Sequence, residues 1–217
     1  MRLLVFLGLF SVAQSWAQKP LFREDQIYIG AGVLIANANQ QPFSQTDFSG
    51  QFQFGLIRDF PISKDSRWAL GIGLGHDYRS LVSNLYLETN PLTNAPQQFR
   101  WLTSDEEPSG FRQSRLVLPL ELRWRSATVT SDIFWRIHGG VKLSYIYRNS
   151  FQNLASSLLN TVVEPWQLSA QLVAGYNTWN FYFEYELLPW LNPDFPNVEG
   201  GQFRLQTFQL GVMFYFL

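Results

Sequence analysis

The chain is built from short segments in which apolar and polar residues alternate. In the stretch QSRLVLPLELRWR (113–125), the even positions are mostly leucine and end at a tryptophan, whereas the odd positions carry four charges and a proline. A period of two places successive side chains on opposite faces of a β-strand. This stretch therefore predicts a strand with one apolar face and one charged face.

Eight segments of this kind follow one another. They cover residues 26–36, 50–60, 68–80, 113–125, 132–148, 165–177, 180–188 and 207–217. None of them shows a sustained 3.6-residue period, and the best helix candidate, residues 150–163, lies between the fifth and sixth segments. The pattern predicts an all-β protein with eight antiparallel strands in up-and-down order.

The connections between these segments alternate in length. Residues 37–48, 81–110 and 149–164 form long links, residues 61–67 and 126–131 form short ones, a tight turn lies near Thr178, and residues 189–202 are intermediate. This alternation is typical of an outer-membrane β-barrel, which has long extracellular loops, short periplasmic turns and both termini in the periplasm.

The N-terminus carries an export signal. Arg2 precedes an apolar run at residues 3–12, and Ser15 and Ala17 place small residues at a cleavage site. We expect residues 1–17 to be a cleaved signal peptide and residues 18–217 to form a single outer-membrane β-barrel domain.

Composition agrees with an exported barrel. Aromatic residues make up 17% of the chain and charged residues only 15%, below the roughly 25% of ordinary globular chains. Beyond the leader, no apolar run reaches the ~20 residues that a transmembrane helix needs. The chain has no cysteine, which excludes disulfides, thiolate metal sites and a lipoprotein anchor. The net charge of −1 does not suggest a nucleic-acid partner.

Either face of such strands could face outward, because a soluble up-and-down barrel such as a lipocalin alternates with its apolar face inside. Gly71, Gly73 and Gly75 repeat on a polar face, where they make room inside a narrow eight-stranded barrel that side chains fill. We therefore predict that the apolar face contacts lipid and that the lumen is filled. Pro119 then requires a local bulge or a lost ladder bond, because a barrel has no edge strand.

Aromatic residues gather near the ends of the apolar faces, as at the two interfaces of a membrane. The expected girdles are Trp68, Trp124, Trp135, Tyr176 and Phe181 near the periplasmic rim, and Tyr78, Tyr145, Tyr147, Trp166 and Tyr185 near the opposite rim. The chain ends in LGVMFYFL, an aromatic-rich terminal strand that resembles the signal read by the barrel assembly machinery. Outer-membrane lipid and this machinery are the expected partners.

Charged residues of both signs fall on the predicted lumen faces. They are Arg115, Glu121, Arg123, Arg136, His138, Lys142, Glu184 and Glu186. Buried charges are tolerated only when they are paired, so we expect a structural ion-pair network that plugs the barrel. Counting back through the connection places Glu121 roughly opposite Arg136.

Catalytic chemistry has one weak candidate. His76, Asp77 and Ser80 combine a base, an acid and a hydroxyl, as in a hydrolase acting on lipid A or phospholipid. Neighbouring strand residues point to opposite faces, so His76 and Asp77 do not readily share a site. Two histidines without a carboxylate at ligand spacing do not indicate a metal site, and GIGLG lies within a strand rather than in a phosphate loop. We predict no catalytic, cofactor-binding or metal-binding residues.

Four stretches carry a resemblance to a known family. WALGIGLGHDYRS, RLVLPLELRWR, FYFEYELLPW and FQLGVMFYFL resemble the PorT-like family of outer-membrane β-barrel proteins. The resemblance implies an eight-stranded outer-membrane barrel, with no agreed catalytic residues, and a role in type IX protein secretion as an assembly or docking factor. The alternatives are an outer-membrane hydrolase acting on lipid A or phospholipid, and a soluble periplasmic lipid-binding barrel.

The long link at 81–110 is the candidate docking loop for secretion proteins. Its apolar anchors are Phe99 and Trp101, and its charges are Asp105, Glu106 and Glu107. Loops on a rigid scaffold often carry binding residues, and aromatic residues are favoured interface anchors. The same loop could instead only cap the barrel mouth, and the sequence leaves this choice open.

Overall fold

The computed structural model describes residues 25–90, 92–94, 96–126, 135–151, 159, 161–196 and 200–216. The strands are β1 (Asp25–Ala38), β2 (Gly50–Pro61), β3 (Trp68–Ser83), β4 (Leu85–Thr89), β5 (Pro96–Trp101), β6 (Ser109–Arg125), β7 (Trp135–Phe151), β8 (Trp166–Tyr176), β9 (Trp179–Glu186) and β10 (Leu205–Phe216). The predicted signal peptide and most of the helix candidate at 150–163 lie outside the described residues. No helix in the described ranges is long and apolar enough to cross a membrane.

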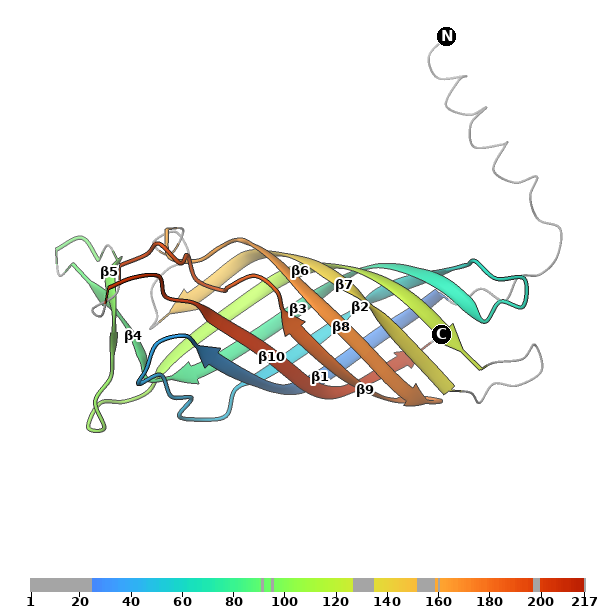
Figure 1. The fold of residues 1–217 in the computed structure, drawn as a ribbon, viewed down its shortest axis with the longest axis horizontal. Coiled ribbons are helices and arrows are strands. Elements are labelled where there is room, and N and C mark those ends of the chain that lie inside the picture. The colour runs from blue at the N-terminus through green and yellow to red at the C-terminus, as the bar shows by residue number, and fades with distance from the viewer. Residues whose placement is uncertain are drawn as a thin grey trace, which may run out of the picture.

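Eight of these strands close into one barrel (Figure 1). Their order around the wall is β1-β10-β9-β8-β7-β6-β3-β2, and every neighbouring pair is antiparallel. The last strand closes the ring against the first, from Ile27 opposite Phe216 to Ala38 opposite Leu205. The predicted eight-stranded antiparallel barrel is confirmed. Closure leaves no edge strand whose unpaired backbone N–H and C=O groups would face lipid without hydrogen-bond partners.

The two ends of the barrel differ. One end, here called the loop end, carries the connections β1–β2, β3–β6, β7–β8 and β9–β10, together with the separate hairpin of β4 and β5. The opposite turn end carries the short β2–β3 and β8–β9 connections and both ends of the barrel chain (Figure 1). The sequence predicted the long loops but not the hairpin between residues 85 and 101.

The apolar face of every barrel strand points outward. On β6, half of the surface of Leu118 is exposed, whereas Arg115 is fully buried. The outward row continues with Leu116, Leu120 and Leu122, all exposed. A soluble barrel of the lipocalin type would have the reverse arrangement, so the outward apolar wall is one that a bilayer covers.

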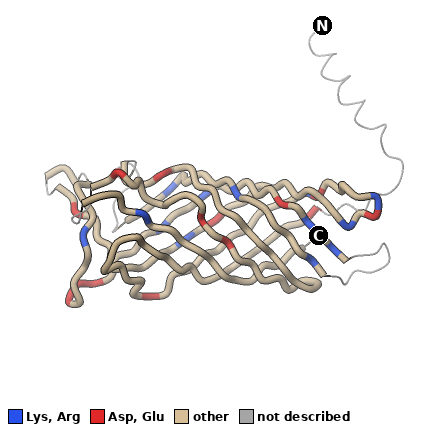
Figure 2. Tube along the Cα trace, viewed as in Figure 1, with Lys and Arg blue, Asp and Glu red and all other residues tan. Residues whose placement is uncertain are grey.

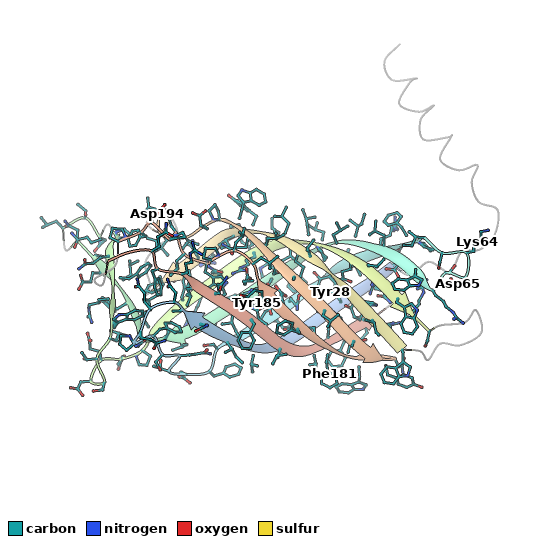
Figure 3. The ribbon with its side chains drawn as sticks, viewed as in Figure 1. Tyr28, Lys64, Asp65, Phe181, Tyr185 and Asp194 are labelled. Carbon is teal, nitrogen blue, oxygen red and sulfur yellow. The ribbon has the colours of Figure 1, made fainter. Side chains whose placement is uncertain are left out.

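Aromatic side chains form two exposed belts around this wall. Strands β3, β7 and β8 each carry one member of both belts, in the pairs Trp68 and Tyr78, Trp135 and Tyr145, and Tyr176 and Trp166. The two members of a pair are ~10 residues apart, which at ~3.3 Å per residue and a tilt of ~40° spans ~25 Å of membrane normal. Phe181 lies on the outer surface of the wall, on the side of the barrel away from the turn with Lys64 and Asp65 (Figure 3). The spacing matches the apolar band of an outer-membrane barrel.

Pro119 interrupts one ladder without shifting its register. The β3–β6 pairing runs from Ile72 opposite Leu120 directly to Gly75 opposite Val117 and omits the positions between them. A Cβ added at Gly73 would lie 2.9 Å from the Pro119 ring, so the glycine makes room for it. An interrupted ladder was one of the two predicted outcomes. Between β6 and β7 the register shifts at Ser114 and Arg115 and is regular at Pro119, which lies opposite Lys142.

Candidate functional site

The lumen contains two layers of charged side chains, and the layer nearer the loop end is centred on Arg79. Its guanidinium lies 2.7 Å from Asp77 and 2.5 Å from Glu184, and it also pairs with Glu186. These four side chains are completely buried. Two strands that are distant in sequence, β3 and β9, are therefore tied together across the inside of the barrel.

Two further cations complete this layer. Arg115 lies 2.6 Å from Glu186, and the Lys142 ammonium lies 2.6 Å from Glu184. The layer thus sets three cations, Arg79, Arg115 and Lys142, against three carboxylates, Asp77, Glu184 and Glu186. Equal numbers of opposite charges are what a dry lumen requires, because an unpaired buried charge is strongly destabilising.

Neutral polar groups add further hydrogen bonds to this layer. Gln51 donates to Asp77 at 2.8 Å, Ser169 donates to Glu184 at 2.8 Å, and Lys142 donates to Gln53 at 2.7 Å. These contacts fix the rotamers of the charged groups. The arrangement is that of a packed plug rather than a channel lining.

The second layer lies nearer the turn end and is centred on Arg123. This guanidinium pairs with Asp59, lies 3.4 Å from Glu121, and donates to Gln26 at 2.7 Å. It also lies over the Tyr215 ring, 5.1 Å from the ring centroid. Basic and acidic positions are accordingly interspersed along the barrel (Figure 2).

Tyrosines anchor the inside of the wall to glycines on neighbouring strands. A Cβ added at Gly75 would lie 2.0 Å from the Tyr28 hydroxyl, and one added at Gly32 would lie 2.5 Å from the Tyr182 hydroxyl. Any larger residue at these positions would displace the buried ring. The glycines on the lumen face are therefore needed for close approach, as expected from their repetition along β3.

All eight charged residues expected in the lumen are buried there. The set is Arg115, Glu121, Arg123, Arg136, His138, Lys142, Glu184 and Glu186. The structure adds Asp59, Asp77 and Arg79 to the network. The expected position of Glu121 opposite Arg136 is wrong: Glu121 pairs with Gly140, and Arg136 pairs with Arg125, because β6 continues in register four residues further toward its connection.

The barrel mouth at the loop end is closed by a second, apolar plug. Between the Arg79 layer and the loop end, the inward-facing positions change from polar to apolar, and loop residues pack onto them. This cap core consists of Leu34, Ala38, Leu81, Leu85, Leu87, Phe99, Phe111, Ile146, Phe151, Leu159, Val162, Val163, Trp190, Leu191, Phe195, Phe203 and Leu205. Trp190 is fully buried at the junction, where the Arg115 guanidinium lies 4.9 Å from its ring centroid. The lumen is thus closed by the ion-pair layers inside the barrel and by apolar packing at the loop end.

The residues of the candidate docking loop have different surroundings. Phe99 is 2% exposed and contacts Phe151, Phe195 and Phe203 within the cap core. Trp101 is half-buried against Phe203. Phe99 is therefore part of the cap rather than an accessible docking anchor, because its ring is needed to close the mouth.

The three acidic residues of that loop are exposed, and one of them is fixed. Glu106 accepts two hydrogen bonds from Arg100, at 2.6 and 2.9 Å, and one from the Thr103 backbone at 2.9 Å. The Arg100 hydrogen bonds lower the pKa of Glu106 to about 2. Asp105 and Glu107 have neither of these bonds and face solvent. The clamp holds the loop in place and leaves two acidic groups presented at the loop end.

The hydrolase candidate is divided by the barrel wall. His76 lies on the outer face and bonds the Tyr147 hydroxyl at 2.8 Å, whereas Asp77 is buried in the lumen. Ser80 lies four residues along the same strand, ~13 Å away at ~3.3 Å per residue, far beyond hydrogen-bond reach. Within the described residues no group of three or more His, Asp or Glu side chains could hold a metal ion.

The closed barrel, its apolar exterior and its aromatic belts define an outer-membrane β-barrel protein. The chain belongs to the family described as outer membrane protein beta-barrel domain, whose model matches residues 13–216. Membership places the protein in the outer membrane.

The solved structures that are similar to this chain include two other outer-membrane proteins. The outer membrane protein OprG from Pseudomonas aeruginosa is 12% identical, with 89% of this chain and 97% of that chain covered and a TM-score of 0.39. Ail, the attachment invasion locus protein of Yersinia pestis, crystallised with the heparin analogue sucrose octasulfate, is 10% identical, with coverage of 89% and 99% and a TM-score of 0.33. No match was found among curated proteins.

Proposed function

We propose that this protein is a non-conducting, non-enzymatic outer-membrane barrel that acts through its loop-end surface. The observation that carries the proposal is the double closure of the lumen by the Arg79 layer and the cap core. A barrel closed at two levels does not offer a route for solutes or polypeptide. The protein would then act through contacts made by its loop-end surface.

The proposed orientation places the loop end outside the cell and both termini in the periplasm. Long loops at one end and short turns at the other support this orientation, since outer-membrane barrels direct long loops outward. The proposed partners at the turn end are limited to the assembly machinery, which would engage β10 before it pairs with β1.

The resemblance to the PorT-like family makes type IX protein secretion the specific process in this proposal. A plugged eight-stranded barrel cannot pass a folded protein, so its part would be docking or assembly beside a larger channel. The docking surface would be the exposed segment 103–108 together with Leu92, which is 91% exposed at the tip of the β4–β5 hairpin. Loops on a rigid scaffold that expose apolar and acidic groups favour a protein partner.

The test uses a strain that secretes type IX cargo and lacks this protein. Wild type is compared with a variant carrying Leu92→Ser, Asp105→Asn and Glu107→Gln, which changes the exposed surface and leaves Glu106 and the cap core intact. Asp65→Asn at the turn end is the matched control, because it neutralises an exposed acid far from the loop end. We expect the control, but not the triple variant, to restore cargo export, with normal barrel assembly in both.

Two results would separate the parts of this proposal. Normal cargo export in the deletion strain would refute the secretion role while leaving the barrel assignment intact. Full restoration by the triple variant would show that this surface is not where docking occurs.

A further inference from the structure

A polar patch lies on the outer wall directly beyond the loop-end aromatic belt. It is formed by two cross-strand rows on β3, β6 and β7: Tyr78–Ser114–Arg148 and, one step further out, Ser80–Arg112–Ser150. The parity of these rows is that of the outward leucines on β6, so their side chains face the membrane side of the wall. The belt residue Tyr78 fixes the height of the patch at the level of lipid headgroups.

The two arginines of this patch are available to an anion. Both side chains are exposed, and within the described residues neither Arg112 nor Arg148 has a carboxylate partner. Together with Ser114 and Ser150 they line a polar pocket of about 250 Å³. Arg58, an outward arginine at the turn end, differs because it lies 2.6 Å from Asp25.

An apolar groove adjoins the polar pocket. It has a volume of about 620 Å³ and is lined chiefly by outward apolar residues, including Val33, Phe52 and Leu210. Tyr78 lines both the groove and the polar pocket, and Ser80 in the groove is the cross-strand partner of Arg112. A basic pocket at headgroup height therefore continues into an apolar groove at acyl-chain height.

We propose that this composite surface binds a lipid with a phosphomonoester headgroup. The Arg112 and Arg148 guanidiniums would contact the phosphate oxygens, the serine hydroxyls would donate to the same group, and an acyl chain would occupy the groove. Guanidinium groups suit phosphate because they offer several donors in a planar fork, and clustered basic residues at the membrane surface attract anionic lipid. The groove commits the site to a lipid rather than to a free anion.

The experiment measures lipid retained on the intact, detergent-purified barrel by native mass spectrometry. The probes are long-chain phosphatidic acid, long-chain phosphatidylcholine and inorganic phosphate. Wild type is compared with Arg112→Gln/Arg148→Gln, and with Arg204→Gln as the matched control, because Arg204 is an exposed loop-end arginine outside the pocket. The heat-dependent gel shift confirms that each variant is folded.

We expect wild type and the control to retain phosphatidic acid in preference to phosphatidylcholine, and the double variant to bind it about tenfold more weakly. A second variant, Ala31→Trp, fills the groove from its outer face and should also weaken retention. Equal retention by wild type and the double variant would overturn the site. Displacement of the lipid by inorganic phosphate at comparable concentration would overturn its assignment to a lipid.

Discussion

Removal of Arg79 should show how much the stability of the barrel depends on charge balance in the ion-pair layer nearer the loop end. Arg79→Met keeps most of the side-chain volume but leaves three buried carboxylates against Arg115 and Lys142. Breaking a buried pair by removing one partner typically costs about 3–5 kcal/mol, because the remaining charge is not compensated. We expect the free energy of unfolding in lipid vesicles to fall by about this amount.

A second substitution makes this prediction specific. Asp77→Asn removes one carboxylate, and the layer then retains the two remaining pairs, Arg115 with Glu186 and Lys142 with Glu184. The double variant should therefore be less destabilised than the sum of the two single variants, with a coupling energy of about 1–3 kcal/mol. Urea unfolding followed by tryptophan fluorescence and gel mobility measures all four proteins. Strict additivity, or an Arg79→Met barrel as stable as wild type, would refute the charge-balance reasoning.

Three further predictions address the wall and the loop end. Leu118→Arg should cost about 2–4 kcal/mol in a bilayer, read from heat-modifiable gel mobility; normal folding of this variant together with collapse of Arg115→Leu would mean that the faces are reversed. Gly75→Ala should destabilise the barrel because its Cβ would meet the Tyr28 hydroxyl, whereas Gly139→Ala, with only Leu172 nearby at 3.8 Å, should not; equal effects would show that the tyrosine contact is unimportant. The pKa of Glu106 is lowered in the fold to about 2, so the Arg100 clamp should stabilise the loop above the ordinary carboxyl pKa and weaken as pH falls toward 2. Acid-stable protease cleavage near residue 103 should rise across that range in wild type, and a Glu106→Gln protein should lack this pH dependence.

Much of the barrel could be predicted because strand parity is a strong signal where one face meets lipid. In RLVLPLELRWR (115–125), all four leucines fall on even positions and all four charges on odd positions, which also hold Val117 and Pro119. A shift of one residue would therefore bury the wrong face. The same parity placed Glu184, Glu186 and Lys142 in the lumen. It did not select their partners, because pairing across the lumen depends on the shear of the closed ring rather than on any one strand.

The cap could not be predicted in the same way. Beyond the aromatic belt the inward positions become apolar, as at Leu81 and Phe111, and the strands then carry apolar residues on the face that is polar within the membrane. That change of polarity was a readable signal of a plugged mouth. The hairpin of β4 and β5 gave little warning, because its short strands alternate weakly and Phe99 is buried only by loops that are distant in sequence. Its burial is the reason that an apolar docking anchor at that position is not available.

The central claim is that the barrel is closed, and single-channel recording tests it most directly. Purified wild-type protein is inserted into planar lipid bilayers, with insertion confirmed by the folded gel form recovered from the same vesicles. The charged layers and the cap core predict an electrically silent membrane at all applied voltages. Reproducible ohmic steps from the folded wild-type barrel would contradict the account, because they would require an open path past Arg79 and Trp190.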